Sequence, residues 1–301
     1  MKRLIFLCAL VFAVPVSLAS TEINERAALK KDGLLMVIST EGEVVISGWS
    51  QNEVEVTGTL GKEAEKLIFD VDGDEILVKV EQRKEKRDYN SWRSNSDGTK
   101  LMIRAPHSAH LKVKTVSADV NIDGIRGMQR VRTVSGDLHS RVEGEEAELR
   151  TVSGDLHVMG NGKIKEVSLY SVSGEIEGSG LAGEVWAESV SGDIELAARD
   201  VKEARLKTVS GDIEGSLDLL KDAEVHMESV SGDIEVSLPK NYAAEYELTS
   251  FSGDIGRILG IEPTRKSKYS PGSELMYTHG KSKARVRANS MSGDIDIEMD
   301  L

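Results

Sequence analysis

Acidic residues recur along this chain at a nearly constant spacing, which could bring their carboxylates close enough together to bind a cation. Consecutive members lie 18 to 21 residues apart. If each interval forms one coil of a stacked β-structure, neighbouring carboxylates lie about 4.8 Å from each other. Carboxylate oxygens in such a row suit Ca²⁺. We call this series the acidic ladder; it comprises Asp119, Asp137, Asp155, Glu175, Asp193, Asp212, Asp233 and Asp254.

Two interpretations of the acidic ladder compete. Stacked carboxylates repel each other by about 1 kcal/mol in water, so each needs a compensating partner. We expect each carboxylate to accept a nearby backbone N–H in an Asx-type turn, with no metal and no cofactor bound. The alternative is a row of calcium sites, for which Asp193, Asp212 and Asp233 are the candidates. The calcium-binding nonapeptide pattern of other β-rolls is absent from the chain.

A second outward row follows two positions after each acid, and it contains two histidines. His139 and His157 are one coil apart, and Glu177 follows in the next coil. Two imidazoles and a carboxylate are a ligand set that could hold Zn²⁺. However, a flat strand surface rarely brings three ligands to one point, so we expect solvated side chains here. The whole row is Asn121, His139, His157, Glu177, Glu195, Glu214 and Glu235.

Motifs of known catalytic classes are missing from the sequence. It has no nucleophile elbow, no zincin motif, no phosphate-binding loop and no dinucleotide fingerprint. The acids occupy one repeated structural position, whereas an active site needs a unique cluster. We therefore expect no catalytic residue and no enzymatic activity. Because parallel β-helices also host polysaccharide lyases and hydrolases, a β-helical carbohydrate-active enzyme is the alternative.

The acids belong to a hexapeptide, Thr/Ser-Val-Ser-Gly-Asp-Ile/Leu, that returns about every 20 residues. Before one copy, Ala147, Leu149 and Thr151 alternate with Glu148 and Arg150, which is typical of a half-buried strand. The Ser-Gly pair predicts a bend, and the Ile/Leu begins a second short strand. A fixed period of this length is the signature of a stacked repeat architecture.

Glycine at the bend accepts backbone angles that other residues avoid, so we expect a conformation open to glycine alone. Valine at Gly154 or Gly192 should then be strongly destabilising. One copy carries Ala118 at this position, which suggests that alanine is tolerated.

A single coil buries too little apolar surface to offset the entropy of ordering it, so the coils must stack. We predict an all-β fold, a single-stranded parallel β-helix or β-solenoid, with a less regular β-rich N-terminal cap. A right-handed coil is expected because parallel β crossovers prefer that hand. The last step of the repeat, from Asp254 to Asp294, is twice as long as the others and is interpreted as two coils.

The first 19 residues have the pattern of a secretory signal peptide. Lys2 and Arg3 precede an apolar run that is too short to span a bilayer, and Ser17-Leu18-Ala19 offers a cleavage site. We expect an exported protein, periplasmic or extracellular, without a transmembrane anchor. Cys8 is the one cysteine of the chain and lies inside the signal. The mature protein is therefore expected to contain neither disulfides nor thiolate metal sites.

Charge argues against nucleic acid as a partner. The chain has a net charge of -13, and removing Lys2 and Arg3 with the signal leaves about -15, because residues 1–19 contain no acid. Such a field repels nucleic acid and anionic lipid. An envelope protein or a polysaccharide is the partner we expect, although the sequence identifies neither.

The remaining chain divides into a β-rich cap region, 20–105, continuous with solenoid repeats over 106–301, with a loop insertion around 256–285. Two irregular stretches carry chemistry that the repeats lack, and loops on a rigid scaffold often carry function. We therefore place candidate binding residues there, because aromatic and arginine side chains are enriched at binding hot spots. The candidates are Tyr89, Trp92, Arg265, Lys266, Lys268 and Tyr269.

The Ser-Gly-Asp-Ile series resembles that of a bacterial putative-adhesin family, a domain of unknown function that includes the LiaG-like proteins. Other shared markers are Glu41-Gly42-Glu43-Val44 and Ile103-Arg104-Ala105-Pro106. The resemblance covers nearly the whole mature chain and implies the repeat fold, but it transfers no catalytic residue. We expect a non-enzymatic binding, adhesion or scaffolding protein of the cell envelope. An envelope-stress accessory protein acting through a protein partner is a further alternative.

Overall fold

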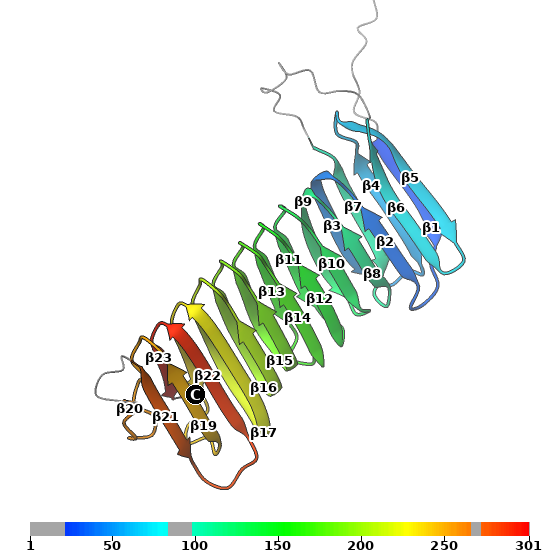
Figure 1. Cartoon of the computed structure of the whole chain (residues 1–301). Helices are drawn as coiled ribbons and strands as arrows, with labels where there is room; N and C mark the ends of the chain where they lie inside the picture. The colour runs from blue at the N-terminus through cyan, green and yellow to red at the C-terminus, as the bar shows by residue number, and fades with distance from the viewer. Residues whose placement is uncertain (1–21, 84–97, 266–271, 301) are drawn as a thin grey trace, which may run out of the picture.

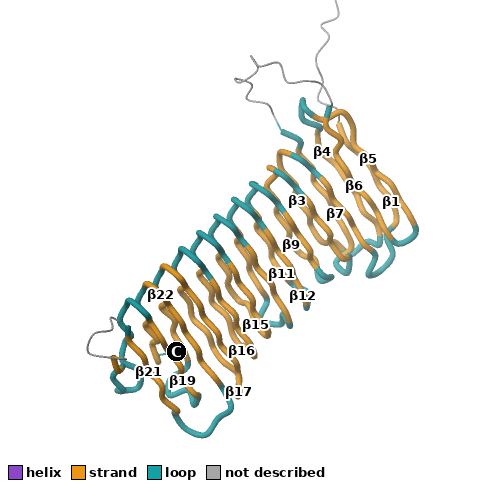
Figure 2. The backbone as a smooth tube through the Cα atoms, viewed as in Figure 1, coloured by secondary structure: helices purple, strands orange, loops and turns teal. Residues whose placement is uncertain are grey.

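The computed structural model describes residues 22–83, 98–265 and 272–300, and within these ranges every regular element is a β-strand. The strands stack into one elongated body whose turns align along its edges (Figures 1 and 2). The predicted all-β solenoid is confirmed, whereas the hand of its coil stays a prediction. Residues 1–19, which carry the predicted signal peptide, lie outside the described ranges.

Each coil contributes one strand to each of two sheets. The turn-entry sheet contains the strands that run into the Ser-Gly-Asp bend, and these pair in parallel from coil to coil. In spatial order it comprises β6 (Glu75–Gln82), β2 (Leu34–Ile38), β8 (His110–Lys114), β10 (Gln129–Arg132), β12 (Glu146–Arg150), β14 (Glu166–Tyr170), the ends of β15 (Ile176–Glu188), β16 (Ile194–Lys207) and β17 (Ile213–Ser231), then β22 (Arg285–Ser292) and β19 (Glu245–Ser250).

The turn-exit sheet contains the strands that leave the bend, again in parallel. In spatial order it comprises β7 (Lys100–Pro106), β3 (Glu41–Trp49), β9 (Ser117–Ile125), β11 (Leu138–Val142), β13 (Leu156–Gly160), the beginnings of β15, β16 and β17, then β18 (Ile234–Leu238) and β23 (Ile295–Met299). Antiparallel strands complete the two ends: β1 (Glu22–Ala28), β4 (Glu53–Thr59), β5 (Ala64–Asp72), β20 (Thr264–Arg265) and β21 (Ser273–Thr278).

The core is a set of aliphatic ladders between the two sheets. Val131, Leu149 and Leu169 occupy the same position in successive coils and are fully buried, as the alternation of the sequence predicts. The Thr/Ser that opens each hexapeptide is buried as well. In four coils its hydroxyl accepts the N–H of the bend glycine three residues later, at 2.9 Å for Thr151 and Gly154. In four others the hydroxyl donates to the carbonyl of a bend glycine in the neighbouring coil. This position therefore favours a short side chain with a hydroxyl group.

The bend glycines are required for a reason that the sequence did not reveal. Gly154 and Gly192 do not have positive φ angles, so the expected glycine-only conformation is wrong. Instead, the bends stack directly on one another. A Cβ added to Gly154 would lie 2.1 Å from the carbonyl oxygen of Gly136 in the preceding coil. The constraint is contact between coils. Ala118 is the exception: it stacks on Gly42 of strand β3, in the coil whose bend lacks the Ser-Gly-Asp sequence.

The order of coils at the C-terminal end departs from the order of the sequence. Strand β22 pairs in parallel with β17 on one side and with β19 on the other (Figure 1). The N–H of Asp294 donates to Asp233, and the N–H of Asp254 donates to Asp294, at 2.7 and 2.8 Å. The 40-residue step is therefore not two coils. The chain forms the Asp254 coil first, returns through β20 and β21, and inserts its last coil beneath it.

The N-terminal end is built in the same way. Strand β2 pairs with both β6 and β8, and β3 pairs with both β7 and β9. The first coil, formed by β2 and β3, is thus held between two coils that follow it in sequence. Because each of these terminal coils has a neighbour on both faces, its backbone groups are paired on both sides instead of forming an open sheet edge.

Candidate functional site

The acidic ladder forms one continuous line along the edge that carries the bends, which we call the turn edge. One carboxylate oxygen of every ladder aspartate except Asp254 accepts the backbone N–H of the acid in the next coil, as from Asp137 to Asp119 at 3.1 Å and from Asp233 to Asp212 at 2.8 Å. The predicted N–H compensation is present. However, the donor belongs to the neighbouring coil, so the expected local Asx-type turn is wrong.

Glu175 interrupts this pattern. Its own N–H donates to Asp155 at 3.0 Å, but among the described residues no hydrogen bond joins its carboxylate to the N–H of Asp193. Burial, followed by the charges of Glu177, Asp155 and Asp193, raises the pKa of Glu175 above that of an ordinary glutamate. The aspartates of the ladder are therefore held by geometry that a longer side chain does not reproduce.

Calcium is expected to leave the stability of the protein unchanged. Asp193 and Asp212, two of the three candidate calcium ligands, already use one oxygen to accept an intercoil N–H, at 2.9 and 2.8 Å. Thermal unfolding followed by circular dichroism, with calcium and then with a chelator, measures this directly. A calcium-dependent rise in Tm that disappears in a protein carrying both Asp193→Asn and Asp212→Asn would contradict it.

The two histidines stack face to face on the turn-exit sheet. The ring centroids of His139 and His157 are 4.5 Å apart with an interplanar angle of 6°. Nδ1 of His157 lies 2.5 Å from Oε2 of Glu177. Parallel rings direct their nitrogens side by side instead of toward one point. Within residues 22–83, 98–265 and 272–300, no group of three or more possible ligands could hold a metal ion.

An exposed apolar row runs along the turn edge, and the sequence reasoning missed it. The second residue of every hexapeptide points outward, between the buried Thr/Ser and the exposed serine. Its side chain is 37% to 64% exposed in nine coils. The signal was present as an apolar residue at a position where alternation predicts a polar one. We call this row the apolar ridge: Val116, Val134, Val152, Val172, Val190, Val209, Val230, Met291 and Phe251.

Most of the predicted binding-loop residues cannot be placed. Tyr89, Trp92, Lys266, Lys268 and Tyr269 lie outside the described residues. Arg265 is described; it is exposed in β20, and its Nη2 atom lies 3.9 Å from Oδ1 of Asp254. The loop hypothesis therefore stays a prediction.

A cluster of arginine and aromatic side chains on the turn-entry sheet was also missed. Glu148 accepts hydrogen bonds from Arg130, Arg132 and Arg150 at 2.7 to 3.0 Å. Burial acts to raise the pKa of Glu148, but these three guanidinium groups hold it below the ordinary value. The guanidinium carbon of Arg150 lies 4.0 Å from the centroid of the Tyr170 ring.

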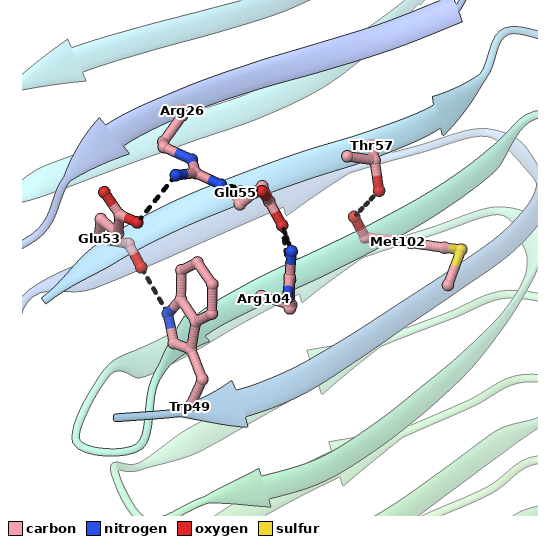
Figure 3. A network of polar contacts seen from close by, with 7 residues as sticks. All are labelled: Arg26, Trp49, Glu53, Glu55, Thr57, Met102 and Arg104. Atoms are coloured by element: carbon pink, nitrogen blue, oxygen red, sulfur yellow. Dashed lines mark hydrogen bonds and ion pairs between the residues drawn. The ribbon is translucent and has the colours of Figure 1, made fainter. Parts of the chain in front are cut away.

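A polar network ties the N-terminal strands together (Figure 3). Glu55 of β4 binds Arg26 of β1 and Arg104 of β7, so one carboxylate joins three strands. The hydrogen bond from Arg26, and then that from Arg104, hold the pKa of Glu55 below its usual value although burial opposes them. Arg104 also lies 4.6 Å from the ring of Trp49, whose indole N–H donates to the carbonyl of Glu53 at 2.7 Å. We interpret this network as structural.

The family model described as Toastrack DUF4097 matches residues 35–298. The chain belongs to this family. It is a domain of unknown function, so the Toastrack assignment defines the fold and leaves the activity open. No curated protein matches the chain.

Several solved structures are similar to this Toastrack chain at low identity. A putative adhesin from Bacteroides fragilis is 11% identical, with 93% of this chain and 98% of that chain covered and a TM-score of 0.41. A putative lipid binding protein from Parabacteroides distasonis is 14% identical, with 92% and 96% covered and a TM-score of 0.46. A putative adhesin from Parabacteroides merdae is 13% identical, with 72% and 89% covered and a TM-score of 0.35.

These similarities are too low to transfer a function to the Toastrack chain. In the part of the chain that the structure describes, no helix is long and apolar enough to cross a membrane.

Proposed function

We propose that this Toastrack protein is an exported, non-enzymatic binding and scaffolding protein of the cell envelope that holds a partner protein along its turn edge. The apolar ridge is the observation that carries the proposal. Nine apolar side chains stack in consecutive coils, each more than a third exposed. At about 4.8 Å per coil, the ridge is about 38 Å long. Contiguous exposed apolar surface of this kind marks interaction sites in soluble proteins.

A structural role explains only part of the ridge. Stacked valines pack against each other, which stabilises neighbouring coils. Threonine would provide almost the same packing without exposing a second methyl group to water. The ridge also widens at its C-terminal end, where Met291 and Phe251 are 58% and 64% exposed. Large apolar residues at the most exposed positions favour contact with a partner.

Charge indicates the chemistry of that partner. The acidic ladder runs beside the ridge for its whole length, three residues further along each coil. Six of its carboxylates are fixed by intercoil N–H groups, so they form a rigid acidic border. We infer a partner segment with a row of apolar side chains bordered by Lys or Arg. Anionic lipid does not fit this border.

The same geometry supports a non-enzymatic role. Except at Glu175 and Asp254, each ladder carboxylate is engaged in holding the next coil, as from Asp155 to Asp137 at 3.1 Å. The acids therefore perform one repeated structural task and do not converge on a substrate position.

Site-specific photocrosslinking in cells tests the proposal. A photoreactive residue at Val172, on the ridge, should capture one partner protein reproducibly. The same residue at Leu220, which is 43% exposed on a different part of the coil, is the matched control and should not. Changing Val152, Val190 and Val209 to threonine should reduce capture at least tenfold with little change in Tm, because exposed substitutions cost little.

Charge is tested separately with asparagine in place of Asp155 and Asp193, because asparagine keeps the oxygen that accepts the intercoil N–H. Binding of the purified partner should weaken with these substitutions and with added salt. Equal capture at Val172 and Leu220, or capture unaffected by the threonine substitutions, would overturn the proposal.

A further inference from the structure

The turn-entry sheet has one place where its surface departs from the repeat. From β8 to β19 a single outward row crosses this sheet, one residue per coil, and its members there are almost all charged or polar. Trp186 is the exception, with charged or polar neighbours on either side. In spatial order the row is Lys112, Arg130, Glu148, Ser168, Trp186, Arg205, His226, Arg287 and Glu247.

A second aromatic outlier lies one coil away. The next outward row contains Tyr170 between Arg150 and Glu188, and from β8 to β19 its other members are again charged or polar. Trp186 and Tyr170 are both half-buried and stand on neighbouring strands. The coils above and below accept polar residues at these positions without losing register. The fold itself therefore does not require an aromatic side chain at either position.

The two rings border a hollow. Ser168 is small and lies between Glu148 and Trp186, so the surface is recessed there. The recess has a volume of about 230 Å³. At about 30 Å³ per water, this is the volume of roughly eight waters, which is close to that of one sugar ring. The lining side chains include Arg130, Arg150, Glu146, Glu148, Glu166, Tyr170 and Trp186.

The lining has both donors and acceptors of hydrogen bonds. Its two arginines are balanced by three glutamates, so neither charge sign dominates. Glu148 is saturated by its three arginine partners, whereas no ion pair engages Glu146 or Glu166 among the described residues. The buried indole N–H of Trp186 has no acceptor within that same part of the chain. This N–H is itself covered, so the hydrogen-bonding groups that the hollow offers to a ligand are those of Glu146, Glu166 and Arg150.

We propose that this hollow binds one sugar unit of an uncharged glycan. The C–H face of a pyranose ring packs against the indole of Trp186, beside the Tyr170 ring. Its hydroxyl groups donate to the carboxylates of Glu146 and Glu166 and accept from the guanidinium of Arg150. The hollow lies on the sheet face and not on the apolar ridge, so this proposal goes beyond the partner protein inferred above and does not depend on it.

Binding of chitotetraose and cellotetraose, measured by calorimetry and by ligand-observed NMR, tests the proposal. At least one of these uncharged oligosaccharides should bind with a Kd of about 1 mM, as suits a small open site. Trp186→Ala removes one wall of the hollow, and Ser168→Arg fills it. Each substitution should weaken oligosaccharide binding at least tenfold. His226→Ala, in the same row but two coils away from Trp186, should leave it within twofold.

Three outcomes would overturn the glycan proposal. One is that neither oligosaccharide binds when its concentration is about ten times the expected Kd. Another is binding that survives both Trp186→Ala and Ser168→Arg in proteins with unchanged circular dichroism. The third is that Trp186→Ala abolishes photocrosslinking of the partner protein at Val172 while no oligosaccharide binds. That result would assign the hollow to a side chain of the partner protein.

Discussion

Gly154→Ala is expected to lower the stability of the protein sharply, although alanine is the smallest possible addition. The new Cβ would lie 2.1 Å from the carbonyl oxygen of Gly136 in the preceding coil. The backbones of the two bends must therefore separate by roughly 1 Å. Overpacking of this kind costs about 3 kcal/mol. The intercoil bond between Asp155 and Asp137 would lengthen at the same time.

Thermal unfolding measures this effect, and a drop in Tm of at least about 5 °C is expected. Gly192→Ala should behave in the same way, because its Cβ would meet the carbonyl oxygen of Gly174 at 2.1 Å. Gly162→Asn is the control, since that glycine has a φ of +71°, which asparagine tolerates, and nothing within 4 Å of its Cβ position. If Gly154→Ala unfolds at the temperature of the unmodified protein, the bends do not stack as closely as described.

Removing the last coil, from Arg285 onward, is expected to unfold more of the chain than the part removed. Strand β22 separates β17 from β19, so without it β19 loses its parallel partner. Strand β23 supplies the corresponding pairing for β18. Coils earlier in the stack contact only their own neighbours, so they should keep their structure.

Hydrogen exchange resolves this outcome by segment. Protection should disappear from β19 and β21 and persist from β10 to β16. A point variant gives the same test without truncation: Ala288→Asp places a charge between Met227 and Leu248, all three of which are fully buried. Arg287→Ser, at the adjacent exposed position, is the control. Unchanged protection in β19 after either disruptive change would show that the terminal coil does not hold that end together.

The terminal coils show the limit of prediction from the repeat. The hexapeptide at Ser290 to Ile295 is almost the same as that at Ser250 to Ile255, so either copy could stack on the Ser229 to Ile234 coil. Local sequence therefore does not specify which copy is the inner one. The antiparallel pairing of β19 with β21 decides it, because that hairpin covers the outer side of β19 and leaves its inner side for β22.

Of the candidate sites, too, one part could be predicted from the sequence and another part could not. The acidic ladder was predicted from spacing, since one acid per coil must align when the coils stack. Its N–H donors were assigned to the wrong coil, because an Asx-type turn and an intercoil bond have the same sequence signature. The hollow beside Trp186 was missed, because its walls come from residues of different coils, brought together by parallel register.

By itself, the sequence determined the two-strand coil, its bend and the identity of the buried ladders. These depend on side-chain alternation and turn chemistry within about 20 residues, which are local properties. Tertiary structure alone decided the order of the terminal coils, the reason for each bend glycine, and which outward side chains became neighbours. All three depend on contacts between coils. Because the coils have nearly the same sequence, local sequence does not specify which coils become neighbours, and these contacts are fixed only when the complete stack forms.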